Sequence, residues 1–207
     1  MIVATMKTTR VLQTNISETD IDQVSEILNT STNNRVAICN ANTLVRSVND
    51  SEIRRSINNF TIKTPDGFPV AKALSFLTKH KFSRVDGYKV FLQTIEDGLN
   101  RNRRHYFFGN NTEITQLMID NLTQKFPNIE ISGYLCPEFL SADELVNKYK
   151  KEIESLNTDI IWVSLGFPKQ EIFIDKICRE INSSANFVGI GAVFEWIAGT
   201  KKKAPEW

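Results

Sequence analysis

The sequence predicts an α/β protein with a mostly parallel, Rossmann-like sheet, helices on both of its faces, and a small N-terminal α/β half. Short apolar runs typical of buried strands alternate along the chain with longer amphipathic runs typical of helices. The second half contains four such strands separated by helices, a pattern that favours parallel pairing. Right-handed crossovers then place helices over both faces of the sheet.

The first half alternates helices and strands from residue 19 onward. Phe91, Ile95 and Leu99, for example, recur at the spacing of one helical face. The predicted elements are a helix over 19–29, a strand over 35–39, a helix from 43 to about 58, a strand over 60–63, and helices over 68–80 and 88–99.

The second half shows the same alternation more clearly. Strands are predicted over 105–108, 129–134, 159–165 and 186–190, with helices near 112–125, 141–156 and 168–181. We expect one domain over 1–207, made of an N-terminal half, 1–100, and a Rossmann-like half, 101–207. The polar stretch Arg101-Asn-Arg-Arg104 is the predicted seam between them.

Composition narrows the classes of function. The chain has 25 Lys and Arg against 24 Asp and Glu, so no overall field attracts nucleic acid, and nucleic acid is not an expected partner. Cys39, Cys136 and Cys178 are odd in number and widely spaced, which favours a reducing compartment over disulfides or zinc. No apolar run approaches the roughly 20 residues that cross a bilayer, so we expect a cytoplasmic protein, at most attached to a membrane surface.

Ligands of doubly wound folds bind outside the carboxyl ends of the strands. Five segments in such positions are unusual in composition. They are Asn40-Ala-Asn42, Thr64-Pro-Asp66-Gly67, Gly109-Asn110-Asn111, Gly166-Phe-Pro-Lys-Gln-Glu171 and Gly189-Ile-Gly191.

Asp66 has two interpretations that the residues alone do not separate. In a Pro-Asp-Gly turn before a helix it is suited to an Asx turn or a cap. A carboxylate at a strand end is also suited to take a proton from an acceptor hydroxyl as a general base.

The segment from Gly166 to Glu171 opens a helix with Pro168 in its first turn. Its backbone N–H groups and Lys169 favour an anion, and a plain strand-to-helix turn remains the alternative. Gly189-Ile-Gly191 lacks the third glycine of a dinucleotide fingerprint and follows the last strand, so it supports a nicotinamide site only weakly.

No metal site and no organic cofactor are expected. Asp20-Ile-Asp22 has the spacing of a metal-binding DxD, but it stands at a predicted helix start, where acidic residues suit the helix dipole. His80 and His105 have no partner at metal-ligand spacing.

Taken together, these segments resemble the WecG/TagA/CpsF family of bacterial glycosyltransferases, which includes N-acetylmannosaminyltransferases. The matching pieces run in order over nearly the whole chain. They are Asn40-Ala-Asn42, Pro65-Asp66-Gly67, Arg84-Val-Asp-Gly87, Phe108-Gly109, Gly133-Tyr134, Gly166-Phe-Pro-Lys-Gln-Glu171, Gly189-Ile-Gly191-Ala-Val-Phe-Glu195, Ala198-Gly199 and Ala204-Pro205-Glu-Trp207.

The resemblance implies an inverting, metal-independent enzyme of cell-surface polysaccharide synthesis. Such an enzyme moves a sugar, of N-acetylmannosamine type, from a UDP-sugar to a polyprenyl-diphosphate-linked sugar. It works peripherally at the inner face of the cell membrane. A non-catalytic module that binds a UDP-sugar is the alternative, and an NAD-linked dehydrogenase is a third candidate.

By position, the resemblance implies that Asp66 is the catalytic base. The substrate side of the site is expected at Asn40, Asn42, Arg84, Lys169 and Gln170. The nucleotide side is expected at Gly109, Tyr134, Gly166, Gly189, Gly191 and Glu195. Tyr134 is expected to stack on uracil and Glu195, where the family more often has Asp, to accept from ribose hydroxyls.

Members of the family continue past the segment that matches Ala204-Pro205-Glu-Trp207 into a basic tail that contacts the membrane. We therefore expect that a C-terminal membrane-associating tail is absent from these 207 residues.

Overall fold

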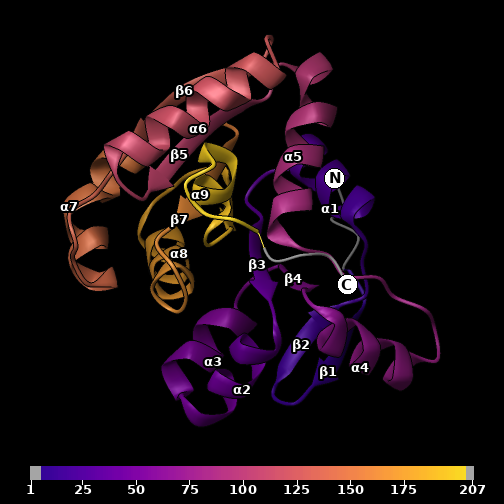
Figure 1. Ribbon diagram of the computed structural model, residues 1–207. Helices are drawn as coiled ribbons and strands as arrows, with labels where there is room; N and C mark the ends of the chain where they lie inside the picture. The colour runs from indigo at the N-terminus through magenta and orange to yellow at the C-terminus, as the bar shows by residue number, and fades with distance from the viewer. Residues whose placement is uncertain (1–5, 204–207) are drawn as a thin grey trace.

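Six parallel strands form one continuous sheet (Figure 1). In chain order they are β3 (Arg35–Cys39), β4 (Ile62–Pro65), β5 (Arg104–Gly109), β6 (Glu130–Leu135), β7 (Ile160–Ser164) and β8 (Asn186–Gly189). Their spatial order is β4-β3-β8-β7-β5-β6. Because β8 pairs with β3 on one side and β7 on the other, strands from both halves of the sequence share the sheet. This computed structural model describes residues 6–203, so the segment 204–207 quoted above lies outside the described residues.

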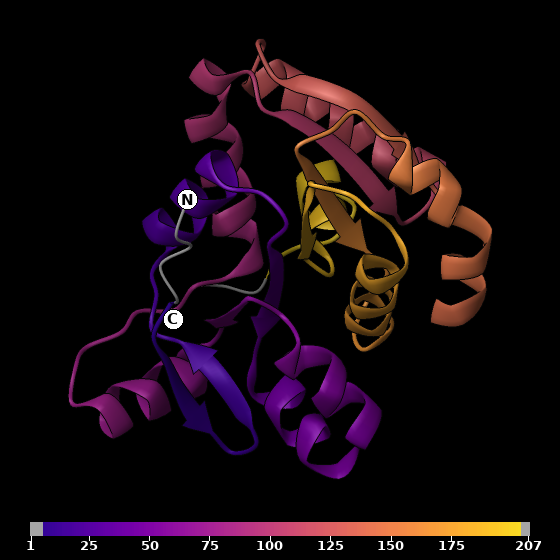
Figure 2. The same cartoon turned by 180° about the vertical axis from the view of Figure 1, so that it is seen from behind.

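Helices cover both faces of the sheet, which confirms the predicted fold class (Figure 1 and Figure 2). The core on one face includes side chains of α1 (Ile21–Thr30), α5 (Gly87–Gly98), α6 (Thr112–Lys125) and α9 (Val193–Ala198). The core on the opposite face includes side chains of α2 (Ala41–Asn49), α3 (Ser51–Asn58), α4 (Phe68–Thr78), α7 (Ala142–Glu154) and α8 (Lys169–Glu180).

The alternation of side chains along a strand explains why both cores are apolar. Phe107 and Phe108 are neighbours on β5 and point to opposite faces. Phe107 packs with Phe91 of α5, with ring centroids 6.2 Å apart. Phe108 stacks on Phe173 of α8 at 4.8 Å. Neighbouring positions of a central strand such as β5 therefore both carry apolar side chains, as expected for a sheet that is covered on both faces.

Two predicted boundaries were wrong. The single helix expected from 43 to about 58 is two helices, because Asp50 ends α2 and caps α3 by accepting from the backbone N–H groups of Glu52 and Ile53. The strand expected over 60–63 begins two residues later, and its last residue is Pro65.

The sequence interpretation also missed a hairpin and the short helix α9. The hairpin consists of β1 (Thr8–Val11) and β2 (Thr14–Ser17), which pair antiparallel. It packs beside the sheet edge, where Ser17 Oγ accepts from the backbone N–H of Lys63 at 3.0 Å. Strands of four residues with few apolar positions give too weak an alternation to be recognised.

Within residues 6–203, none of the helices has both the length and the apolar character that a membrane-crossing segment needs.

Candidate functional site

An open cavity of about 270 Å³ lies at the carboxyl ends of β3, β4 and β8. We call it the cleft. Its lining combines charged and polar groups with an apolar wall. The lining residues are Ile38, Asn40, Thr43, Asp66, Arg84, Asp86, Gly87, Phe167, Gln170, Glu171, Ile190, Gly191, Ala192, Trp196 and Lys203.

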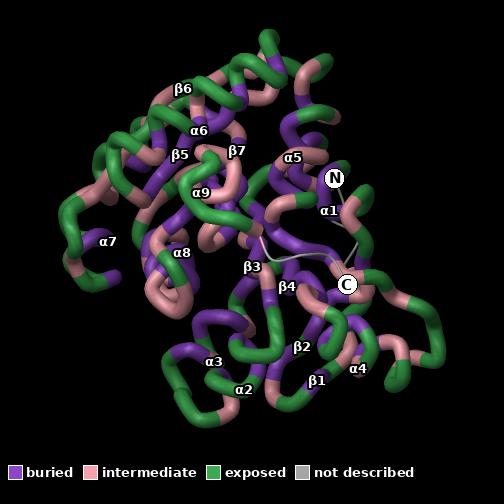
Figure 3. The backbone as a smooth tube through the Cα atoms, viewed as in Figure 1, coloured by how far each residue is buried: buried purple, intermediate pink, exposed green. Residues whose placement is uncertain are grey.

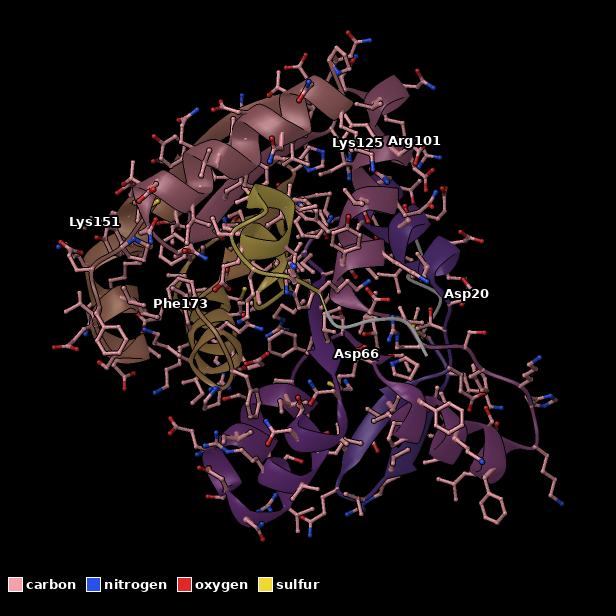
Figure 4. The ribbon with its side chains drawn as sticks, in the orientation of Figure 1. Asp20, Asp66, Arg101, Lys125, Lys151 and Phe173 are labelled. Carbon is pink, nitrogen blue, oxygen red and sulfur yellow. The ribbon has the colours of Figure 1, made fainter. Side chains whose placement is uncertain are left out.

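Asp66 stands at the cleft directly after β4, near the middle of the molecule (Figure 4). Its backbone N–H donates to Cys39 O at 3.0 Å, so the turn that carries it is tied to the end of β3. Burial raises the pKa of its carboxyl, and the neighbouring Asp86 carboxylate raises it further, while Arg84, the Gly67 backbone and Lys203 act in the opposite direction. A carboxylate with a raised pKa is a stronger proton acceptor than an exposed aspartate.

Asp86, Arg84 and Lys203 form a charged cluster beside Asp66. Arg84 Nη2 lies 3.1 Å from Asp86 Oδ2, and Lys203 Nζ lies 3.5 Å from Asp86 Oδ1. Asp86 also caps α5 by accepting from the Lys89 backbone N–H. Both carboxylate oxygens of Asp86 therefore interact with cations. The Asp66 carboxyl accepts a hydrogen bond from the Gly67 backbone.

Gln170 and Glu171 form the floor of the cleft at the start of α8. Gln170 is 4% exposed and its amide is held at both ends: Oε1 accepts from the Gly191 backbone N–H at 3.1 Å, and Nε2 donates to Glu171 Oε1 at 2.8 Å. Glu171 is 1% exposed, and burial raises its pKa to about 7. Gly189 leaves room for this pair, since a Cβ there would lie 3.1 Å from Gln170 Nε2.

Asn40 and Asn42 differ in where they lie. Asn40 lines the cleft and caps α2, with Oδ1 accepting from the Thr43 backbone N–H at 3.1 Å. Asn42 is exposed one residue into α2 and is not among the cleft-lining residues.

A second cavity of about 500 Å³ adjoins the cleft and shares Gly191 and Ala192 with it. It lies at the carboxyl ends of β5, β7 and β8. Its lining residues are Asn110, Pro137, Glu138, Phe139, Ser164, Leu165, Gly166, Lys169, Gly191, Ala192, Glu195 and Lys201. We call it the side cavity.

Lys169 and Glu195 both line the side cavity and carry opposite charges. Lys169 Nζ donates to Leu140 O at 3.3 Å and lies 4.4 Å from the centroid of the Phe139 ring. Glu195 Oε1 lies 3.9 Å from Lys201 Nζ. Gly166, with a φ of 76°, also lines the side cavity. The space around it is open, since the position of a Cβ there has no neighbouring atom within 4 Å.

Gly109 and Tyr134 are not among the residues that line either cavity. At Gly109 the φ is 126°, and a Cβ would lie 2.3 Å from Ser164 O, so the glycine allows β5 and β7 to approach. Tyr134 lies half-exposed on the edge strand β6. The structure thus brings together most of the predicted residues but leaves Gly109, Tyr134, Asn42 and Gly189 outside the lining of both cavities.

Two of the candidate metal ligands named from the sequence, Asp20 and His105, have structural partners. Asp20 caps α1 by accepting from Gln23 N at 2.8 Å. His105 is buried and accepts from Trp162 Nε1 at 3.0 Å, and burial lowers its pKa to about 4. Among residues 6–203, no three His, Cys, Asp or Glu side chains gather in a way that suits a metal ion.

The predicted site residues do not include Asp86, Glu171, Trp196 or Lys203, all of which line the cleft. Asp86 and Glu171 lie inside two of the segments that carry the family resemblance, so the sequence did contain a signal for both residues. Trp196 and Lys203 belong to α9 and the chain after it, and no sequence pattern places them opposite β4.

Comparisons with known proteins indicate the family to which the chain belongs. A profile of the glycosyl transferase WecG/TagA/CpsF family matches residues 8–207. The N-acetylglucosaminyldiphosphoundecaprenol N-acetyl-beta-D-mannosaminyltransferase of Bacillus subtilis (strain 168) is 31% identical over 153 residues, which are 73% of this chain and 57% of that protein. The protein of the same name from Staphylococcus aureus (strain MRSA252) is 30% identical over 152 residues, 72% of this chain and 57% of that protein. The chain thus spans little more than half the length of these relatives, and it belongs to the glycosyl transferase WecG/TagA/CpsF family.

Proposed function

We propose that the chain is the core of a glycosyltransferase that moves a sugar from a UDP-sugar to a polyprenyl-diphosphate-linked sugar at the inner face of the cell membrane. Family membership and the names of the relatives support an N-acetylmannosamine donor and an N-acetylglucosamine acceptor on a lipid diphosphate. The enzyme serves in the synthesis of a cell-surface polysaccharide.

The observation that carries the proposal is the Asp66 carboxyl in the cleft, with a raised pKa and with the neighbouring Asp86 already paired. Asp66 takes the proton of the acceptor hydroxyl while that oxygen forms a bond to the anomeric carbon. The bond from the anomeric carbon to the UDP oxygen breaks, and UDP leaves with the electron pair. A single displacement of this kind inverts the anomeric centre, and the base contributes roughly 10²–10⁴ in rate.

The two adjoining cavities suit the two parts of a nucleotide sugar. The sugar lies in the cleft near Asp66, Asn40 and Gln170, and the nucleotide lies in the side cavity near Gly166, Lys169 and Glu195. Gly191 stands where the two cavities meet.

Cations border both cavities. Arg84 and Lys203 line the cleft, and Lys169 and Lys201 line the side cavity. Positive charge placed where negative charge develops on the leaving group stabilises the transition state. We therefore propose that transfer needs no metal, and that EDTA leaves the rate unchanged. A large loss of rate restored by manganese would contradict this.

The experiment is transfer from a panel of UDP-sugars to a short-chain lipid diphosphate that carries N-acetylglucosamine, with Asp66→Asn compared with wild type. The variant keeps the size of the side chain and much of the turn hydrogen bonding but cannot accept the proton. We expect the transfer rate to fall by roughly 10²–10⁴ while UDP binding and thermal stability stay close to wild type.

Asp20→Asn is the matched control, because Asn serves as well as Asp at the N-cap of α1, and its rate should equal wild type. An Asp66→Asn variant that keeps more than about a third of the wild-type rate would show that Asp66 is structural. If no sugar and acceptor pair gives transfer while UDP still binds, the chain is the non-catalytic UDP-sugar-binding module.

A further inference from the structure

The helix α4 exposes large apolar side chains to solvent. Phe68 is 68% exposed, Phe76 is 84% exposed and Leu77 is 52% exposed. Phe68, Lys72 and Phe76 follow one another at spacings of four residues, so they share one helical face, while Val70 and Leu74 pack into the core. Other exposed apolar side chains in the described residues, such as Leu117 and Phe139, are scattered over separate elements.

Positive charge is concentrated in the segment of the chain that carries this apolar face. The stretch from residue 67 to residue 85 contains no Asp or Glu and carries Lys72, Lys79, Lys81 and Arg84, in a chain whose overall charge is only +1. Lys72 Nζ lies 5.2 Å from the centroid of the Phe68 ring, so cation and aromatic ring lie side by side. We call Phe68, Lys72, Phe76, Leu77, Lys79 and Lys81 the α4 face.

The α4 face lies at the periphery of the molecule, together with the loop that follows it. Both views place α4 and this loop at the outer edge, away from α7 and β6 (Figure 1 and Figure 2). Figure 3 shows exposed backbone along the second half of the helix and the loop. A groove lined by Phe68, Ala71, Lys72, Ser75, Phe82, Ser83, Arg84 and Lys89 runs along α4, and it shares Arg84 with the cleft.

We propose that the α4 face docks on the surface of an anionic bilayer. Exposed aromatic side chains beside lysines are the composition of helices that lie in the interface of a membrane. The charge is complementary to anionic lipid headgroups, which attract basic residues near the surface. Docking in this way brings the groove, and with it Arg84, which also lines the cleft, to the layer from which a lipid-linked substrate would enter.

The test is flotation of the 207-residue chain with vesicles of phosphatidylcholine alone or of an equimolar mixture of phosphatidylcholine and phosphatidylglycerol. We expect binding to the mixed vesicles and much weaker binding to phosphatidylcholine. The vesicles contain no acceptor and the measurement needs no turnover, so its failure is separate from failure of the proposed function.

Two variants and two matched controls test the surface itself. Phe76→Ser should lower the partition into mixed vesicles about tenfold, because an exposed ring that inserts into the interface is lost. Phe139→Ser removes a ring that is even more exposed, on the loop between β6 and α7, and should leave the partition unchanged. Lys72→Glu should lower it at least about fivefold, whereas Lys151→Glu on α7 should not.

The proposal is wrong if the wild-type chain binds both kinds of vesicle equally, or neither. It is also wrong if the α4 variants and their controls lose binding to the same extent. Sedimentation of the free chain tests whether the α4 face is instead a contact between two copies of the chain. In that case wild type would be a dimer that does not bind vesicles, and Phe76→Ser would dissociate it. Melting temperatures of the four variants close to wild type exclude unfolding as the cause of any loss.

Discussion

Glu171 is a buried carboxyl at the floor of the cleft, and no partner for its Oε2 is found within the described residues. Burial raises its pKa to about 7 because the charged form is poorly solvated there. The folded protein then holds this proton more tightly than the unfolded chain does. The free energy of unfolding should therefore fall as the pH rises from about 4.5 to about 7 and should be insensitive to this group above that range.

Glu171→Gln mimics the protonated side chain and keeps an oxygen that accepts from Gln170. We expect the variant to exceed the stability of wild type by less than about 1 kcal/mol at pH 5 and by up to about 3 kcal/mol at pH 8. Urea unfolding at the two pH values measures the difference, and Glu113→Gln, an exposed carboxyl on α6, should show none. An equal effect of Glu171→Gln at both pH values would mean that the carboxyl is ionised at pH 5.

Gly109 is the glycine with the tightest surroundings. With a φ of 126° and Ser164 O at 2.3 Å from a built Cβ, Gly109→Ala should destabilise the protein by at least about 2 kcal/mol. Gly166→Ala is the control, because its φ is 76° but its surroundings are empty, so it should cost only about 1 kcal/mol. Urea unfolding compares the two variants, and equal losses would show that β5 and β7 separate easily.

At the scale of elements, Asp50 separates α2 from α3. Its carboxylate accepts from two backbone N–H groups at the start of α3, and the negative charge suits the helix dipole. Asp50→Ala should lower the free energy of unfolding by about 0.5–2 kcal/mol without changing UDP binding.

Asn49→Ala, one residue earlier at the end of α2, is the control for Asp50→Ala. Its side chain makes one long hydrogen bond, at 3.5 Å to Val45 O, so we expect little change in urea unfolding. If the two variants were equally stable, the cap would contribute nothing, and the division into two helices would need another cause.

At the scale of the whole molecule, UDP should raise the melting temperature and NAD should not. A ligand of the native state at a hundredfold excess over its Kd stabilises a protein by about 2.7 kcal/mol. Lys169→Gln should weaken UDP binding at least about tenfold because it removes a cation from the side cavity, whereas Lys151→Gln should not. Unchanged UDP affinity in Lys169→Gln would place the nucleotide elsewhere, and stabilisation by NAD would favour a dehydrogenase.

Hydropathy along the chain was enough to predict the fold class and the order of most elements. The apolar runs at β3, β5, β7 and β8 are buried on both faces, so local hydropathy alone marks them as strands. The predicted parallel strands also indicated where the site lies, because the carboxyl ends of parallel strands meet at one edge of the sheet. Asp66 and Gln170 follow two of these strand ends.

Which residues share a cavity follows from the order of the strands in the sheet, and the sequence did not show that order. The insertion of β8 between β3 and β7 brings Gly191 against Gln170 and carries the chain after α9 toward Asp86. The same order of strands leaves Tyr134 on the edge strand, outside both cavities. Local pattern could not supply these facts, because strand order is set by the packing of the whole sheet. The pKa of Glu171 likewise depends on burial among residues distant in sequence, which no local spacing encodes.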